Sequence, residues 1–263
     1  MKKKIKISLY TILSLLFVAG AGYWGYQIVK ADIYGSSLVA WYTLDSNDIS
    51  GTSVTDKSGN GNTGTTQNSP TAVPGKLGQA LKFVTASNQY IDAGNNSSVQ
   101  VTGNITLATW FNATAINFPY DGLIVKGYDG SHTGYQLDFQ NDVSTGGVNA
   151  LLCASYNGSS FGTYYAYGSN IVTGKWYHAV CTYDGTNWNL YLNGTLVAHT
   201  AGAQGAFSTS QNLIIGEANF GGASSAFSGS FDDVRVYNRA LSAAEMAQLY
   251  EQGLGRFNSF NDF

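Results

Sequence analysis

Short apolar or alternating segments, separated by Gly, Asn and Asp, dominate the chain from residue 38 onward. Segments of this length, rich in aromatic and β-branched residues, predict β-strands. The predicted strands are 38–44, 80–84, 89–92, 105–111, 122–126, 135–139, 150–156, 176–183, 188–192 and 195–198. Strands this short and this closely spaced favour an antiparallel sandwich or barrel.

Two turns and one helix complete this pattern. Asp184-Gly185 and Asn193-Gly194 predict tight turns between consecutive strands, because these residues accept positive φ. Near the C-terminus, Ser242 and Glu245 form a capping-box pattern, and apolar residues follow at helical spacing. Gly253 predicts the end of this helix.

The first 31 residues differ from the rest. They hold five of the 13 basic residues and no acidic one, and 7–29 carry no charge. This arrangement, followed by Val29-Lys30-Ala31, predicts a secretory signal peptide cleaved before Asp32. A retained membrane anchor is the alternative, since a helix of this length can cross a bilayer. Both interpretations predict a secreted protein or one on the extracellular cell surface, with membrane contact only through an uncleaved N-terminus.

The remaining sequence fits a single large β-domain. We expect a signal peptide or anchor over 1–31, a domain over 36–253 and a tail over 254–263. Beyond residue 31, the eight remaining basic residues face 16 acidic ones, a net charge of −8. Nucleic-acid binding needs a basic face, so a nucleic-acid partner is excluded.

Two cysteines, Cys153 and Cys181, fall in separate predicted strands. In an oxidising compartment this pair predicts a disulfide between neighbouring strands. The alternative is two buried free thiols that act as small apolar side chains.

Three segments resemble the laminin G-like (LamG-type) jelly-roll domains of the concanavalin A-like lectin/glucanase superfamily. They are Leu38–Asp45 with Asp56–Gly64, Trp176–Gly185 with Leu190–Gly194, and Gly229–Ser242. The resemblance implies two facing antiparallel sheets in jelly-roll order with paired N- and C-terminal strands. The expected fold is therefore an all-β, two-sheet antiparallel jelly-roll sandwich with the short C-terminal helix and the N-terminal signal or anchor helix predicted above. It does not imply one ligand, because the fold does not fix function.

Related domains often hold a structural Ca²⁺ between the first loop and the last strand. Glycine-permitted turns with Asp, Ser and Asn oxygens suit such a cation. The resemblance nominates as ligands Asp45, Asp56, Asn60, Asn62 and Asp232. The alternative is that these side chains cap turns, bond their own backbone or pair with arginine.

An enzyme is not expected. Retaining glucanases of this superfold need two carboxylates about 5–5.5 Å apart, from an E-x-D-x-x-E pattern on one strand. The chain has three Glu, Glu217, Glu245 and Glu251, and no strand carries a Glu-x-Asp pair. The adjacent Asp232 and Asp233 should point to opposite faces of a regular strand.

Carbohydrate binding is the leading expectation, because aromatic faces cover the C–H surfaces of sugars. The aromatic candidates are Tyr128, Tyr135, Tyr156, Tyr164, Tyr165 and Trp188. Core packing explains the same residues without a ligand. The expected function is therefore an exported, non-catalytic, lectin-like binding module with a glycan partner. The alternative is an adhesive or structural surface protein that binds other cell-surface proteins or self-assembles.

Overall fold

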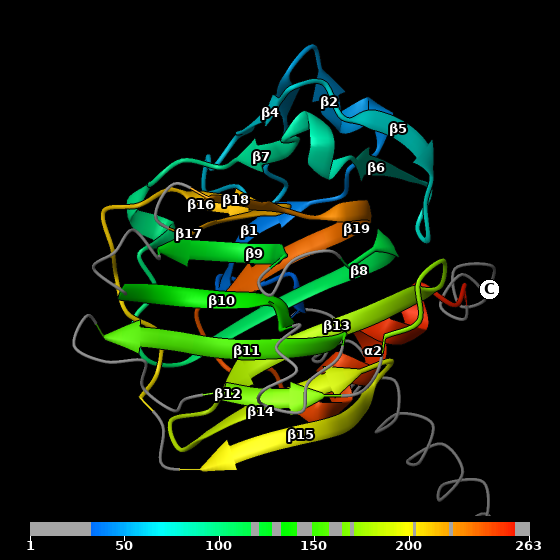
Figure 1. The fold of residues 1–263 in the computed structure, drawn as a ribbon. Helices are drawn as coiled ribbons and strands as arrows, with labels where there is room; N and C mark the ends of the chain where they lie inside the picture. Colours follow the sequence, from blue (N-terminus) through cyan, green and yellow to red (C-terminus); the bar gives the residue numbers. More distant parts are fainter. Residues whose placement is uncertain are drawn as a thin grey trace, which may run out of the picture. The chain divides into compact units, whose positions relative to one another are not determined.

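The computed structural model describes residues 33–116, 121–127, 133–140, 149–157, 165–168, 171–201, 204–220 and 223–255. The predicted leader, 1–31, lies outside these ranges, as does the tail beyond Gly255. The chain divides into two compact units, Met1–Ser37 and Leu38–Phe263. The described residues of the larger unit form two antiparallel sheets, a two-stranded hairpin and one helix (Figure 1).

Sheet A has eight strands. Their order is β15 (Thr195–Ala201), β14 (Asn187–Leu192), β13 (Trp176–Tyr183), β8 (Ile105–Ala115), β19 (Ser228–Tyr237), β6 (Gln79–Phe83) and β5 (Thr71–Pro74), and β1 (Leu38–Tyr42) also pairs with β19. The predicted pairing of the first and last strands is therefore confirmed.

Sheet B has nine strands. Their order is β12 (Tyr165–Gly168), β11 (Ala150–Asn157), β10 (Thr133–Gln140), β9 (Gly122–Gly127), β16 (Leu213–Ile215), β7 (Tyr90–Asp92), β4 (Gly64–Gln67), β3 (Ser53–Val54) and β2 (Ile49–Ser50). The hairpin of β17 (Glu217–Phe220) and β18 (Ala223–Ala226) leads into β19. Three 3₁₀ turns lie at Ser46–Asp48, Thr85–Ser87 and Ser97–Val99.

The core lies between the two sheets and follows the two-residue period of the strands. Phe111 of β8 and Phe231 of β19, both from sheet A, meet Phe139 of β10 and Phe227 in one buried aromatic group. Edge-to-face and stacked pairs of this kind contribute beyond the area that they bury. The all-β sandwich prediction is confirmed.

The predicted helix is α2 (Ala243–Gln252). Its capping box is present, since Ser242 accepts a hydrogen bond from the Glu245 amide and Glu245 accepts one from the Ser242 amide. Gly253 ends the helix as predicted, with a φ of −69°. A Cβ at this position would lie 2.2 Å from the ring of Trp110, so glycine is required for close packing.

In the part of the chain that the structure describes, no helix combines the length and the apolar character that crossing a membrane requires.

Candidate functional site

The five predicted ion ligands fall into two groups. The first group is the loop that follows β3. Both oxygens of the Asp56 carboxylate accept hydrogen bonds, from the amides of Trp41, Ser58 and Asn62 and from the side chains of Ser58 and Asn62. Asn60 and Asn62 donate to the β1 carbonyls of Leu38 and Val39. These contacts fasten the loop to β1 and occupy Asp56 with protein donors.

The second group brings Asp45 and Asp232 together on one turn. Asp45 Oδ1 accepts from the Gln79 amide at 2.7 Å, and Asp232 Oδ2 accepts from the amides of Lys76 and Leu77 at 2.6 and 2.7 Å. Gly78 has a φ of +73°, and a Cβ there would lie 2.4 Å from Asp45 Oδ1. The turn is therefore shaped to let two carboxylates approach its backbone.

A β-bulge in β19 positions Asp232. The register with β8 shifts between Asp232 and Arg235, and Asp233 has a φ of +52°. Asp233 accepts from Trp41 Nε1 at 2.7 Å and from Arg235 Nε at 3.0 Å, and the Arg235 guanidinium lies over the Trp41 ring. The expectation that alternation separates Asp232 from Asp233 is wrong, because the bulge turns both carboxylates to the outer face of sheet A.

The ionised form of the Asp232 carboxyl is unfavourable in this environment. It is fully buried, and no described residue gives its Oδ1 atom a hydrogen bond. Burial, with smaller contributions from the charges of Asp233 and Asp45, raises the pKa of Asp232 to about 8 although two backbone amides oppose this shift. A cation beside Oδ1 would relieve the burial and the repulsion.

The donor set around Asp45 and Asp232 is incomplete for Ca²⁺. No cluster of three or more His, Cys, Asp or Glu side chains suited to a metal ion occurs within the described ranges. Ca²⁺ takes 6–8 oxygen ligands. Two carboxylates fit its charge and hardness, and backbone carbonyls or waters would have to supply the other ligands.

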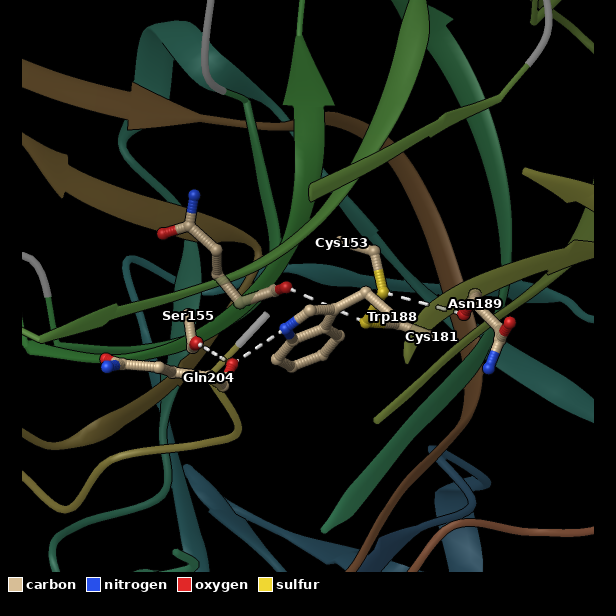
Figure 2. The surroundings of a disulfide bond; sticks show 7 residues. Cys153, Ser155, Cys181, Trp188, Asn189 and Gln204 are labelled. Atoms are coloured by element: carbon tan, nitrogen blue, oxygen red, sulfur yellow. Dashed lines mark hydrogen bonds between the residues drawn. A yellow bond between two sulfur atoms is a disulfide. The ribbon is translucent and has the colours of Figure 1, made fainter. Parts of the chain in front are cut away.

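Two predicted sugar-binding aromatic residues belong to the core instead. Tyr135 is 1% exposed, and its hydroxyl donates to the Val99 carbonyl at 2.9 Å. Trp188 is 0% exposed, packs on Tyr183 and donates to the Gln204 carbonyl (Figure 2). Their assignment to a ligand surface is wrong, because strand alternation turns both side chains inward.

Of the other four aromatic candidates, two lie in described strands and two lie outside the described residues. Tyr128 and Tyr164 lie outside the described residues. Tyr156 is in β11 and Tyr165 is in β12. Their register partners, Gly134 and Ala154, alternate with core residues of sheet B. The backbone therefore places positions 156 and 165 on the face of sheet B opposite to the core, called the outer face of sheet B below.

The disulfide between Cys153 and Cys181 is confirmed, with a Cα–Cα distance of 5.5 Å. The expected pairing of neighbouring strands is wrong, since Cys153 lies on β11 of sheet B and Cys181 on β13 of sheet A. The bond therefore joins the two sheets through the core. Figure 2 shows Trp188 beside it, with Gln204 held by both Trp188 and Ser155.

A polar group that the sequence reading missed lies on the outer face of sheet B. Gln136 and Asp138 alternate along β10 with Tyr135, Leu137 and Phe139 of the core. Gln136 Nε2 donates to Asp138 Oδ2 at 2.8 Å, while Asp138 Oδ1 receives no hydrogen bond from the described residues. Burial, and then the charge of nearby Asp121, raise the pKa of Asp138 well above its usual value. The alternation of apolar and polar residues over 135–139 is the sequence pattern that could have revealed this pair.

The three glutamates do not form an acid pair. Glu217 is in β17, whereas Glu245 and Glu251 are on α2. Glu245 is occupied by Arg239 and by the Ser242 cap, and these hydrogen bonds lower its pKa despite its partial burial. No described strand brings two glutamates to one face.

Comparisons with solved structures agree with this architecture. Domain 4 of AbnA, a GH43 extracellular arabinanase from Geobacillus stearothermophilus solved with arabinotriose, is similar with a TM-score of 0.61 and 19% identity, over 81% of this chain and 98% of that domain. The binding domain of Paraclostridial Mosquitocidal Protein 1 has a TM-score of 0.65 and 16% identity, over 84% of this chain and 53% of that one. The binding domain of Botulinum Neurotoxin DC, solved with SialylT, has a TM-score of 0.59 and 12% identity, over 84% and 52%.

These identities establish similarity of fold alone, and the chain spans about half the length of the two toxin chains. No curated protein sequence matches the chain. A family profile described as the concanavalin A-like lectin/glucanases superfamily, and named for a laminin G type, matches residues 85–247. That match covers more than half of the sequence and includes the central hairpin and the last strand. The chain therefore belongs to the concanavalin A-like lectin/glucanase superfamily.

Proposed function

We propose that this chain is an exported, non-catalytic module that binds carbohydrate on the outer face of sheet B. The observation that carries the proposal is the polar pair Gln136–Asp138. The strand places both residues on that side of sheet B, where their side chains are buried, at 1% and 0% exposure, and no described residue gives the Asp138 Oδ1 atom a hydrogen bond. Sugar hydroxyls both donate and accept, so they can satisfy a carboxyl and an amide together. Positions 156 and 165, both tyrosines, fall on the same face by strand register.

The similar structures support a carbohydrate as the ligand. One was solved with arabinotriose and another with SialylT. Both contain the jelly-roll fold found here, although at identities too low to transfer a site. The similar structures therefore support carbohydrate as the class of ligand. The choice of binding residues rests on the structure of this chain alone.

A glycan array tests the proposal. We expect saturable binding of the purified chain to one class of glycan. Asp138→Asn should weaken this binding about tenfold or more, because it replaces a carboxyl oxygen with an amide NH₂ group and so changes the hydrogen bonds that the side chain can make. Asp48→Asn, far along the chain in the 46–48 turn, is the matched control and should bind normally. A blank array would contradict carbohydrate binding and favour the alternative, an adhesive or structural protein that recognises cell-surface proteins.

The non-catalytic part of the proposal has its own test. The charge of Asp121 raises the pKa of Asp138, so these two are the described carboxyls near the proposed site that we would test for hydrolysis. We expect no release of reducing ends from glucans or arabinans. Turnover that Asp138→Asn abolishes would contradict this expectation.

Export is supported by two features. The basic and then apolar N-terminus has the pattern of a signal or anchor. The buried disulfide suits an oxidising compartment, where such bonds persist. These features support our proposal of a secreted or cell-surface location. N-terminal sequencing of the mature protein would distinguish cleavage before Asp32 from retention.

A structural Ca²⁺ held by Asp45 and Asp232 belongs to the same proposal. After treatment with a chelator, added Ca²⁺ should raise the melting temperature by about 5 °C or more at pH 8, since saturating ligand stabilises a protein of this size by that order. Asp232→Asn should abolish the response, and Asp48→Asn should keep it. An unchanged melting temperature in the unaltered chain would contradict the ion site.

The pH dependence of the ion-free chain follows from the raised pKa of Asp232. The unfolded chain loses this proton near pH 4, whereas the folded chain keeps it to about pH 8. Between these values the folded state binds more protons, so Asp232 contributes a loss of stability as pH rises. Ca²⁺ should therefore stabilise the chain more at pH 8 than at pH 5.

A further inference from the structure

Three of the four strands that end the main paths of the two sheets are short. Strand β2 has two residues, β12 has four, and β5 has four and ends at Pro74. Short length and proline are common protections, because an exposed edge offers unpaired N–H and C=O groups to another strand.

Strand β15 is longer and contains no proline, so a β-bulge near Val197 is the one such protection that its described residues show. It has seven residues, Thr-Leu-Val-Ala-His-Thr-Ala, without proline or a formally charged side chain. Leu196 and Val197 are 47% and 38% exposed, among the largest exposures of any apolar side chain described. One β-bulge interrupts its register with β14 near Val197, and Ala198–Ala201 then pair regularly with Asn187–Leu190.

The free edge of β15 is open in the described structure. Strand β14 pairs with one side of β15, and no described strand pairs with the other. Strand β12 lies near both β14 and β15, so it packs on their core-facing side and not along the outer edge. Figure 1 shows β15 as the outermost strand of sheet A.

We propose that a second copy of this chain pairs with β15 in antiparallel orientation and joins two copies of sheet A across a two-fold axis. A strand that meets its own copy about such an axis forms a self-complementary contact. Because β15 carries no Asp, Glu, Lys or Arg, this pairing opposes no like charges, in contrast to the net charge of −8 carried by 32–263 as a whole. The contact buries Leu196 and Val197, which the single copy leaves exposed.

The dimer has a consequence for binding that rests on the proposed function. Two linked carbohydrate sites gain avidity of about 10²–10⁴ over one site when both can engage a surface. The dimer itself does not depend on the ligand, so its test can succeed or fail separately from the glycan array.

Sedimentation equilibrium of the full chain over a wide concentration range tests the dimer without any glycan, in detergent so that the apolar N-terminus does not associate. We expect reversible dimers for the unaltered chain and at least about tenfold weaker association for Val197→Lys, because a lysine on an edge opposes its own copy. Val172→Lys, which alters another exposed apolar side chain away from the edge, should dimerise normally. Monomers throughout, or dimers that Val197→Lys leaves unchanged, would overturn the proposal.

Hydrogen exchange gives a second readout that needs no variant. Amides of 195–201 in the unaltered chain should exchange more slowly as concentration rises, because pairing protects the free edge. Unchanged exchange in this strand would equally overturn the proposal, whatever oligomer is observed. Melting curves of both lysine variants show whether each remains folded.

Discussion

Replacing both Cys153 and Cys181 with alanine should lower the free energy of unfolding by about 3–4 kcal/mol. The bond closes a loop with a sequence separation of 28. In the chain-entropy treatment, removing the cross-link gives the unfolded chain more conformational entropy, which lowers the free energy of the unfolded state by about that much. Because the bond joins β11 to β13, it also holds the two sheets together beside Trp188. Denaturant unfolding followed by tryptophan fluorescence measures the loss.

The control for this experiment is reduction of the unaltered chain. Both sulfur atoms are fully buried, so a reductant should act slowly under native conditions and rapidly in denaturant. If the double variant unfolds at the same denaturant concentration as the oxidised chain, the bond has no net stabilising role.

Gly253→Ala should destabilise the chain by about 3 kcal/mol, through loss of the docking of α2. A Cβ at residue 253 would lie 2.2 Å from the Trp110 ring. That ring cannot move aside, since it stacks on Tyr250 at 5.5 Å and lies 5.1 Å from His178. Overpacking of a filled site typically costs about 1–3 kcal/mol, and a buried indole has few alternative rotamers.

Gly255→Ala separates packing from backbone effects. Gly255 has a φ of +69° and open space around the added Cβ. Its replacement should therefore cost only the left-handed backbone penalty of about 1 kcal/mol. Thermal melts should rank the two variants clearly, and equal losses would show that the contact with Trp110 does not limit substitution at residue 253.

Much of the fold could be predicted because local chemistry and global structure agree. Asp184-Gly185 and Asn193-Gly194 lie in the two hairpin turns, with positive φ at Gly185, Asn193 and Gly194. The capping box at Ser242 begins α2 as the residues indicate. Short-range rules of this kind need only the neighbouring residues.

The candidate site was less predictable because it depends on side-chain direction and on breaks in regularity. Trp188 borders a turn, yet its side chain points into the core, because a shift of one residue along a strand reverses the face that a side chain occupies. The bulge that brings Asp232 and Asp233 to one face requires a positive φ at Asp233, and no local sequence pattern predicts that conformation. The disulfide joins opposite sheets, a relation that depends on long-range topology and not on the two strands themselves.

The position of β19 has a consequence for how the molecule is made. This strand lies between β8 and β6 and also pairs with β1, yet only α2 and the tail follow it in the chain. A growing polypeptide therefore cannot complete sheet A until β19 has been synthesised, and β1 must wait for a partner almost 200 residues away. Such distant pairing gives the sheet a high contact order, which makes its folding slow.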